Sequence, residues 1–357
     1  MKFSDYKKLR INGLLLEDSE ILDFCRSHKE KNVRALGRFM EAWLDENSYV
    51  EVQTSGSTGK SKIVKIEKNN MLQSAACTID FFDLKEGDTV LLCLSIDYIA
   101  GKMMTVRALL GGLNLYLMEP CSNPIERLPR DKVIDFAPLV PLQLVDVEDT
   151  KLIKKILLGG SAVDPVLEEK VQTYKACVYH GYGMTETLSH IAVRSVNKDS
   201  KSIIYDALPG VVFELDFRGC LGIRVPFLEQ KVQTNDIVEL VDKTSFRWKG
   251  RIDFVVNSGG VKLSPETIES KIAPLLEQNF FLAGIPDKKF GEQLCLFIEG
   301  EPYSSEEYKT LLNRISIKVT CYERPKSIYF VDQFERTSTK KIQRRKTIQK
   351  ALEHIAR

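Results

Sequence analysis

The feature that most constrains this chain is a repeated alternation of strand-like and helical segments. Strand, helix and strand patterns follow one another twice, at 89–95, 101–112 and 113–119 and again at 154–160, 164–174 and 176–183. Strands separated by helices of this length are typical of parallel βαβ units. The sequence therefore predicts an α/β fold with layered architecture.

The pattern changes in the second half of the chain. Between about 203 and 256, short strands alternate with turns, which predicts a mainly antiparallel β region. A helix is then expected to begin at Ser264-Pro265-Glu266, because serine suits an N-cap and proline suits a first turn. We expect a large layered α/β domain with a β-rich subdomain at 1–252, and a small mobile α+β domain at 253–357.

Composition narrows the class of protein. The chain has 357 residues, 43% of them hydrophobic and 28% charged, and its formal net charge is +2. A balance so close to neutral gives no reason to expect nucleic acid or an acidic membrane as the main partner. Because no apolar stretch approaches the length of a membrane span and no signal-peptide core is visible, we expect a cytoplasmic protein. The eight cysteines are scattered without a C-x-x-C pair, which favours neither zinc binding nor disulfides.

The most informative segment is Thr54-Ser55-Gly56-Ser57-Thr58-Gly59-Lys60-Ser61-Lys62. Glycines and small hydroxyl residues let backbone amides approach phosphate oxygens closely, and a lysine adds countercharge. The segment is not a Walker loop, since Thr54 stands where such a loop needs glycine. On composition alone it could equally be a flexible loop.

Further segments follow in order along the chain. They are Gly159-Gly160, His180-Gly181-Tyr182-Gly183-Met184-Thr185-Glu186-Thr187, Thr234-Asn235-Asp236, a stretch from Gly250 to Glu266, and Arg336-Thr337-Ser338-Thr339-Lys340-Lys341-Ile342-Gln343-Arg344. Taken together, these segments resemble the motifs of the adenylate-forming superfamily, which includes acyl-CoA synthetases, luciferases and adenylation domains. The departures from the superfamily pattern are Ser61 and Glu335 in place of proline, and Asn235 and Lys340 in place of glycine.

The resemblance implies a site for ATP and Mg²⁺. The residues it assigns to the nucleotide are Thr54, Ser55, Gly56, Ser57, Thr58, Gly59, Lys62, Gly160, Gly181, Tyr182, Asp236 and Arg251. It implies that Tyr182 lies against the adenine and that Asp236 holds the ribose hydroxyls. It also implies that Thr185 contacts the α-phosphate and that Glu186 helps to hold the metal.

The same resemblance implies a second half-reaction with coenzyme A. Lys341 would stabilise charge while the acid attacks the α-phosphorus, although its neighbour Lys340 is an alternative for this role. Asp253 would be the hinge between the two domains. Gly259 and Gly260 would form a loop that approaches the thiol acceptor after the small domain has moved.

Within the superfamily, two segments and the short N-terminal region look like the o-succinylbenzoate–CoA ligases of menaquinone synthesis. The segments are DYIAGKMMTVRALLGG at 97–112 and GMTETLSHIAVR at 183–194. Ser189 and His190 are candidate contacts to the acid, although His190 could equally be a satisfied core histidine. Two further cations, Lys102 and Arg194, are expected to be solvated.

Other functions stay open at this stage. The chain could be a CoA ligase for another aromatic or medium-chain carboxylic acid, or an adenylation domain that loads a carrier protein. The departures at Glu335 and Lys340 also leave open a relative that binds nucleotide without catalysis. The expected partners are therefore a small carboxylic acid, ATP and CoA, and a homodimer is left open.

Overall fold

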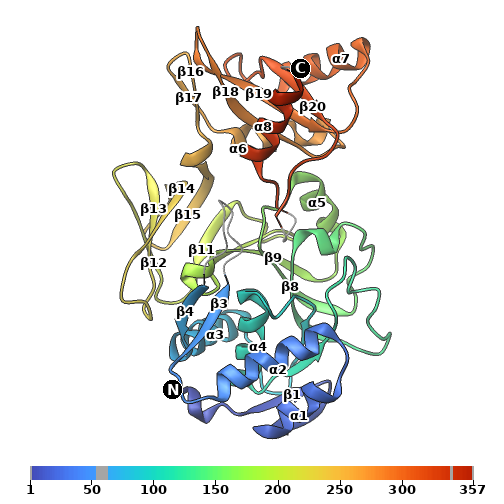
Figure 1. The fold of residues 1–357 in the computed structure, drawn as a ribbon, viewed down its shortest axis with the longest axis vertical. Helices are drawn as coiled ribbons and strands as arrows, with labels where there is room; N and C mark the ends of the chain where they lie inside the picture. Colours follow the sequence, from blue (N-terminus) through green and yellow to red (C-terminus); the bar gives the residue numbers. More distant parts are fainter. Residues whose placement is uncertain (1, 54–62, 338–340, 356–357) are drawn as a thin grey trace.

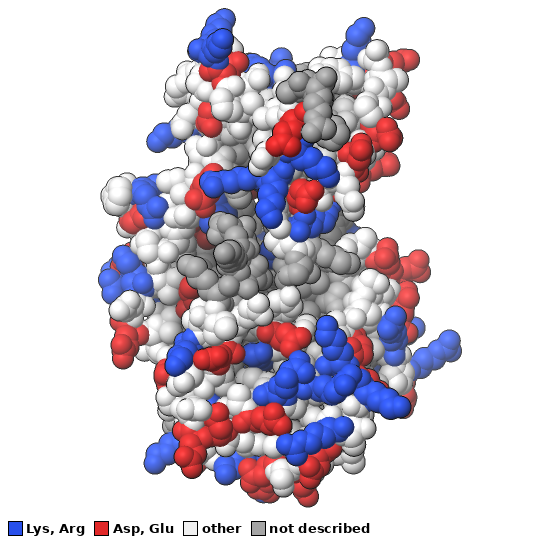
Figure 2. Space-filling view, viewed as in Figure 1, with Lys and Arg blue, Asp and Glu red and all other residues white. Residues whose placement is uncertain are grey.

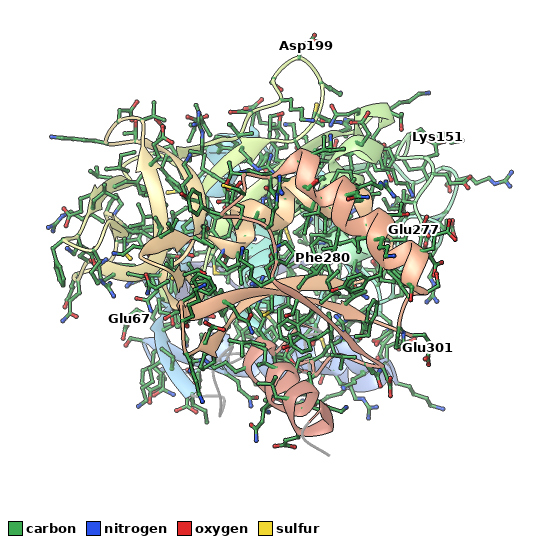
Figure 3. All side chains as sticks on the ribbon, turned by 90° about the horizontal axis from the view of Figure 1, so that it is seen from above. Glu67, Lys151, Asp199, Glu277, Phe280 and Glu301 are labelled. Atoms are coloured by element: carbon green, nitrogen blue, oxygen red, sulfur yellow. The ribbon has the colours of Figure 1, made fainter. Side chains whose placement is uncertain are left out.

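The computed structural model describes residues 2–53, 63–337 and 341–355, and it has two lobes (Figure 1). The chain up to Arg251 forms the large lobe, and the chain from Val256 onward forms the small lobe. Seen from above, Phe280 of the small lobe lies near the middle of the molecule, while Glu67, Lys151 and Asp199 of the large lobe lie towards its margin (Figure 3). The small lobe therefore sits over the large one.

The large lobe is built on a 13-stranded sheet with the strand order β12-β13-β14-β15-β11-β10-β9-β8-β7-β5-β6-β1-β2. The sheet strands are β1 (Lys8–Ile11), β2 (Leu14–Glu17), β5 (Thr89–Leu92), β6 (Asn114–Leu117), β7 (Ile134–Leu139), β8 (Ile153–Leu158), β9 (Cys177–Gly183), β10 (His190–Ser195), β11 (Ile204–Ala207), β12 (Val212–Leu215), β13 (Cys220–Arg224), β14 (Val232–Leu240) and β15 (Ser245–Arg251). A separate hairpin pairs β3 (Tyr49–Gln53) with β4 (Ile63–Glu67).

The described residues of the large lobe form five α-helices, of which the last two connect neighbouring parallel strands. They are α1 (Ser19–Ser27), α2 (Lys31–Leu44), α3 (Lys68–Phe82), α4 (Ile99–Gly111) and α5 (Pro165–Lys170), with short 3-10 turns η1 (Phe3–Asp5), η2 (Pro141–Leu144), η3 (Val171–Thr173), η4 (Thr185–Thr187) and η5 (Ile252–Phe254). None of the helices in the described ranges has the length and apolar character needed to cross a bilayer.

Strands β1, β6, β5, β7, β8 and β9 form a parallel block whose two faces are both covered. Along β5 and just beyond it, Val90 and Leu92 belong to one apolar core, while Leu91 and Cys93 belong to a second. Successive side chains of a strand point to opposite faces, so this division means that the block is buried on both sides. The predicted α/β fold is confirmed.

The strands from β9 to β12 pair antiparallel and extend the same sheet. This block is the β-rich region predicted at 203–256. It carries β14 and β15 side by side, with Asp236 directly opposite Arg251. The antiparallel register therefore brings two residues of separate sequence motifs together.

The small lobe has a sheet of its own with the order β17-β16-β19-β18, and β20 pairs with β19. Its elements are β16 (Val256–Ser258), β17 (Val261–Leu263), α6 (Pro265–Ile272), η6 (Ala273–Leu275), β18 (Phe280–Asp287), β19 (Gly291–Glu299), α7 (Ser305–Lys318), β20 (Ser327–Val331) and α8 (Arg344–Ile355). The sheet is also covered on both faces, because Leu294 and Leu296 pack in one apolar cluster and Cys295 and Phe297 in another.

Helix α6 begins where the sequence predicted, but its N-cap residue does a different job. The Ser264 hydroxyl does not cap the helix. Instead, the Oγ atoms of Ser264 and Thr267 donate to the carbonyl oxygen of Lys249, at 2.9 and 2.8 Å. Since Lys249 lies on β15 of the large sheet, these two bonds join the lobes.

Asn32 fastens the carboxyl ends of β5 and β6. Its buried amide donates to the carbonyl oxygens of Leu94 and Met118, both at 3.1 Å, and accepts from the backbone N–H of Ile96 at 3.1 Å. Three backbone groups beyond the strand ends thus depend on one side chain.

We expect Asn32→Ala to lower the free energy of unfolding by about 3 kcal/mol, because it leaves these backbone groups unpaired away from water. Urea unfolding would measure the loss. Lys31→Ala, one residue earlier on the exposed side of the same helix, is the control and should change stability by less than about 0.5 kcal/mol. Equal losses in the two variants would contradict this role of Asn32.

Candidate active site

The centre of the candidate site is the buried carboxylate of Asp236 on β14. Asp236 Oδ2 accepts a hydrogen bond from Tyr182 Oη at 2.7 Å, and Oδ1 accepts from Trp248 Nε1 at 3.1 Å. Arg251 Nη1 lies 3.8 Å from Oδ1. A carboxylate has about four acceptor positions, so two neutral donors leave capacity for sugar hydroxyls. The structure thus brings Tyr182, Asp236 and Arg251 together, as a ribose site would require.

The glycines beside Tyr182 are needed because β10 runs very close to β9. A Cβ atom on Gly183 would lie 2.2 Å from the carbonyl oxygen of Ser189 and 2.5 Å from the Cα atom of His190. Neither backbone atom can move aside as a flexible side chain could. A Cβ on Gly181 would lie 3.0 Å from the Cβ atom of His190. The glycines of this motif therefore set the distance at which the acid-contact candidates approach β9.

The turn after β9 carries Thr185 and Glu186. Thr185 is half-buried and Glu186 is exposed at the start of η4. No described residue forms a hydrogen bond or ion pair with the Glu186 carboxylate, and the described part of the chain holds no group of three metal-binding side chains. A single free carboxylate suits Mg²⁺, which keeps several waters and takes substrate phosphates as ligands. Glu186 therefore fits the predicted role.

A buried network holds the loop that contains Gly160. His180 Nε2 lies 3.0 Å from the carbonyl oxygen of Ser161, and Tyr205 Oη lies 2.7 Å from His180 Nδ1. The carbonyl oxygen can only accept, so the proton is on Nε2 and Nδ1 accepts from the tyrosine. Burial, with a smaller contribution from Arg194, lowers the pKa of His180 to about 4. A neutral His180 thus supports the loop, where Gly160 adopts a positive φ of 85°.

Ser189 and His190, the predicted contacts to the acid, lie beside a buried cation that was not predicted from the sequence. Arg107 of α4 is 2% exposed, and its Nη2 donates to Ser189 Oγ at 2.5 Å. Its Nε is buried without a hydrogen-bond partner, and no carboxylate of the described residues pairs with it. Burial lowers the pKa of Arg107 to about 9.

The other hydrogen bonds around Arg107 form a chain in which donors and acceptors can be assigned in one consistent order. Ser189 Oγ lies 3.2 Å from His190 Nδ1, and His190 Nε2 lies 3.5 Å from Thr78 Oγ1. Since Arg107 can only donate, the Ser189 hydroxyl accepts from it and is free to donate to His190 Nδ1. Burial and the nearby Arg107 hold the pKa of His190 well below its usual value, so the imidazole is neutral.

Lys341 lies in the segment of the small lobe that leads into α8, and Arg251 is near enough to repel its charge. The pKa of Lys341 is lowered, first by the loss of water around its ammonium group and then by repulsion from Arg251. The residue as a whole still keeps an exposed surface. Figure 2 shows Lys and Arg side chains gathered where the two lobes meet. The end of the Lys341 segment is fixed by Arg344, whose Nη2 lies 2.9 Å from Glu269 Oε2 and whose guanidinium lies 4.7 Å from the Phe254 ring. The alternative lysine, Lys340, lies outside the described residues.

One set of predicted residues, the candidate loop for the thiol acceptor, is not brought to this centre. Gly259 and Gly260 form the turn of the β16–β17 hairpin with φ of 57° and 83°, and this hairpin lies in the small lobe apart from β9 and β14 (Figure 1). The predicted phosphate-loop residues Thr54, Ser55, Gly56, Ser57, Thr58, Gly59 and Lys62 fall outside the described residues, between β3 and β4.

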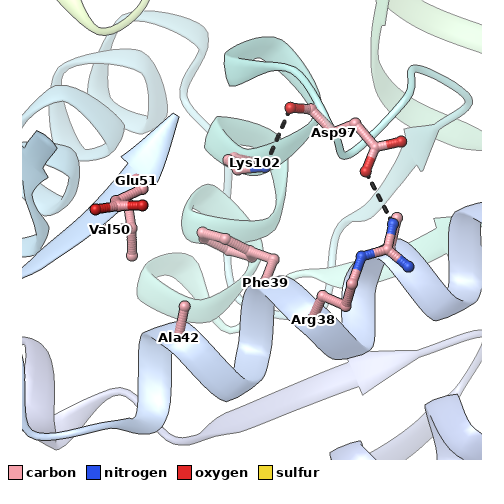
Figure 4. Close-up of a pocket in the computed structure, with 8 residues that line it drawn as sticks. Arg38, Phe39, Ala42, Val50, Glu51, Asp97 and Lys102 are labelled. Carbon is pink, nitrogen blue, oxygen red and sulfur yellow. Dashed lines mark hydrogen bonds and ion pairs between the residues drawn. The ribbon is translucent and has the colours of Figure 1, made fainter. Parts of the chain in front are cut away.

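The other two cations considered from the sequence are not solvated as expected. Lys102 is half-buried, and its Nζ donates to the carbonyl oxygen of Ile96 at 2.7 Å. It lines a hollow of about 160 Å³ in which Arg38 Nη2 lies 2.9 Å from Asp97 Oδ1 (Figure 4). Arg194 is buried and pairs with Glu168. Acceptors of the chain therefore already engage Lys102, Arg38 and Arg194.

Arg107 could have been noticed in the sequence. It is the one charged residue in the stretch from Met103 to Gly112, in which Thr105 is the only other polar side chain. A helix that is apolar on every side is buried, and arginine is rarely buried without a partner. A lone arginine in such a helix therefore indicates a buried charge with a specific purpose.

The chain is similar to proteins of known family and known structure. A model of the family described as AMP-binding enzyme matches residues 8–213. A 2-succinylbenzoate–CoA ligase of Lactococcus lactis is 28% identical over 324 residues, which cover 84% of this chain and 71% of the relative. The crystal structure of an acyl-CoA synthetase (AMP-forming)/AMP-acid ligase II-like protein from Dyadobacter fermentans is 36% identical, with a TM-score of 0.59 and coverage of 92% and 98%.

A further solved structure has a similar fold across nearly the whole chain. It is the O-succinylbenzoate Coenzyme A Synthetase of Bacillus subtilis in complex with ATP and magnesium ion. Its TM-score is 0.75 and its identity is 15%, with 96% of this chain and 97% of that chain covered. Both lobes therefore have counterparts in that protein.

The low pKa of His180 predicts a loss of stability in acid. Between pH 6.5 and about 4 the unfolded histidine binds a proton that the folded one does not, so stability falls as the pH falls. One such group corresponds to about 2 kcal/mol at pH 5. Urea unfolding at pH 7 and pH 5 should show His180→Gln losing about 2 kcal/mol less than the unchanged protein over this interval. Between pH 7 and pH 8 the two proteins should show the same pH dependence, and an equal loss at pH 5 would contradict the assignment.

Proposed function

Because the chain belongs to the AMP-binding enzyme family, we propose that it is an AMP-forming ligase that joins o-succinylbenzoate to CoA. The acid and ATP first give an acyl-adenylate and diphosphate, and the CoA thiol then displaces AMP to give the thioester. Relatives named 2-succinylbenzoate–CoA ligase that align over most of this chain support the proposal. The reaction would take place in the cytoplasm, and a homodimer is left open.

The buried Arg107 is the observation that carries the choice of acid. o-Succinylbenzoate has two carboxylates, of which one reacts and the other must be held. An arginine that is buried without a carboxylate partner is costly, and an anionic ligand removes that cost. Arg107, Ser189 and His190 are thus suited to hold the unreactive carboxylate, because the guanidinium can form charge-assisted hydrogen bonds with it.

The residues around Asp236 would orient the nucleotide for attack. Asp236 would accept hydrogen bonds from the ribose, and Tyr182 would lie against the adenine. Thr185 would contact the α-phosphate, and Glu186 would hold Mg²⁺, which neutralises phosphate charge. Lys341 would stabilise the oxygens that become charged as the acid attacks the α-phosphorus.

The second half-reaction needs Lys341 to leave and another part of the small lobe to take its place. We take residues 1–252 and 253–357 as the two domains, with Asp253 as the hinge. Rotation about the hinge would bring the turn of Gly259 and Gly260 towards the acyl-adenylate. Because neither glycine has a side chain, the thiol of CoA could approach the backbone of this turn closely.

Acid-dependent diphosphate release with MgATP and CoA tests the reaction. The acids to compare are o-succinylbenzoate, benzoate, succinate and octanoate, with mass spectrometry of the CoA product. We expect strong preference for o-succinylbenzoate and detection of its CoA thioester. Preference for octanoate or benzoate would replace the proposed substrate, and no release with any acid would favour a nucleotide-binding protein without catalysis.

Removal of the Arg107 charge should weaken binding of the acid without lowering the free energy of unfolding. We expect Arg107→Met to raise the KM for o-succinylbenzoate about 100-fold while leaving the KM for ATP unchanged, because only the acid loses its cation. The free energy of unfolding should stay equal or rise, since an unpaired buried charge is removed. The matched control is Lys102→Met on the opposite side of the same helix, which should leave both KM values unchanged. A purely structural Arg107 would instead give a destabilised variant with an unchanged KM for the acid.

A further inference from the structure

The chain passes from the large sheet to the small sheet through η5, and the carboxylate of Asp253 is held there from one side. Arg251 Nη2 lies 2.7 Å from Asp253 Oδ2. The Nδ2 atom of Asn235 donates to both oxygens of the same carboxylate, at 3.1 Å to Oδ1 and 3.3 Å to Oδ2. Both partners belong to the large sheet, on β14 and β15. The crossing point is therefore tied to the large lobe by side-chain hydrogen bonds.

A second arginine determines which way the Asn235 amide points. Arg218 Nη1 donates to Asn235 Oδ1 at 3.0 Å, and Arg218 Nη2 donates to the carbonyl oxygen of Thr234 at 3.1 Å. Arg218 is held in turn by Asp216, whose Oδ2 lies 2.8 Å from its Nε. Because a guanidinium can only donate, the amide oxygen of Asn235 must face Arg218 and the amide nitrogen must face Asp253.

Backbone conformation gives no reason for asparagine at this position. Asn235 lies within β14 and is not among the residues with positive φ, so tolerance of the left-handed region is not its purpose. The side chain is what the position uses, since a glycine would leave Asp253 without its amide donor and Arg218 without its amide acceptor.

We propose that Asn235 is a positioning residue that latches the hinge carboxylate of Asp253 to the large lobe and so favours the arrangement of this structure, in which Arg344, at the end of the Lys341 segment, lies on the Phe254 ring of η5. The inference rests on the proposed function and extends it to the balance between the two half-reactions. Rotation of the small lobe about Asp253 must break or rearrange the bonds from Asn235. Their loss would therefore favour the arrangement in which the CoA thiol is used.

The charges around the hinge support this direction. Burial alone would raise the pKa of Asp253, but the bonds from Arg251 and Asn235 outweigh it and lower the pKa, with Arg345 of α8 adding to the effect. The carboxylate is thus ionised at neutral pH, and a hydrogen bond to an ion is stronger than one between neutral groups. The site is partly open to water, which reduces the effect to about fivefold in the equilibrium between the two arrangements.

Two variants of Asn235 test the latch. Asn235→Ala removes the amide, and Asn235→Asp keeps the shape and the acceptor for Arg218 but places a second negative charge beside Asp253. The control is Gln233→Ala, because Gln233 lies two residues earlier on β14 and donates to Asp216 at 3.1 Å without contacting the hinge. ATP–diphosphate exchange measures the first half-reaction, and single-turnover transfer from pre-made acyl-adenylate to CoA measures the second.

We expect the rate of the first half-reaction to fall about fivefold in Asn235→Ala and about 20-fold in Asn235→Asp, while the second is equal or faster. Gln233→Ala should change neither. Equal losses in both half-reactions would show a merely structural residue and overturn the proposal.

Amide hydrogen exchange tests the latch without any substrate. Peptides that cover residues 249–258 should exchange faster in both Asn235 variants than in Gln233→Ala, and unchanged exchange would overturn the latch. If the unchanged protein activates no acid, the proposed function fails, while this comparison still decides whether Asn235 holds the hinge.

Discussion

The Arg251 guanidinium lies between two carboxylates where the chain leaves the large sheet, and the relation of the two lobes depends on it. It is 2.7 Å from Asp253 at the crossing point and 3.8 Å from Asp236 at the centre of the candidate nucleotide site. The register of β14 and β15 sets Asp236 directly opposite Arg251. One cation therefore connects the ribose candidate with the hinge candidate, and a displacement at either carboxylate alters the field at the other.

The lobes are joined by directional bonds at this crossing, and these restrict how the small lobe can sit. Ser264, just before α6, and Thr267 within α6 both donate to the carbonyl oxygen of Lys249, two residues before Arg251. Gly250 follows Lys249 on β15, and a Cβ atom on Gly250 would lie 2.6 Å from Ser264 Oγ and 2.9 Å from Glu266 Oε2. Helix α6 thus packs directly on the backbone of β15. Rearrangement of the lobes therefore has to exchange these bonds.

The sequence was sufficient to predict the fold and to predict that motif residues on neighbouring strands lie close together. The alternation of strand and helix patterns identified the parallel block, and the antiparallel region from about 203 was also predicted, because both signals are periodic and local. The nucleotide candidates Tyr182, Asp236 and Arg251 come together as the resemblance implied. Their assignment to ATP stays a proposal, and the predicted phosphate loop at 54–62 lies outside the described residues.

What the sequence could not give are contacts between residues far apart in the chain. Ser264 occupies the predicted N-cap position, yet its hydroxyl bonds to Lys249 because β15 passes beside it. Asn235 stands where the superfamily has glycine, and the motif alone does not show that its amide donates to Asp253, 18 positions away. A local propensity ranks which residue a position tolerates, but the partner is decided by strand register and packing.

The two buried arginines of the large lobe show how a structural charge differs from one available to a ligand. Arg194 pairs with Glu168 and with Tyr205, and together these neighbours outweigh burial and raise the pKa of Arg194. Arg107 has a serine hydroxyl as its partner, keeps an unbonded Nε, and has its pKa lowered by burial. Breaking or omitting one half of a buried ion pair typically costs several kcal/mol. A fold that retains Arg107 without a carboxylate therefore bears a cost that packing does not explain, and an anionic group of the substrate would offset it.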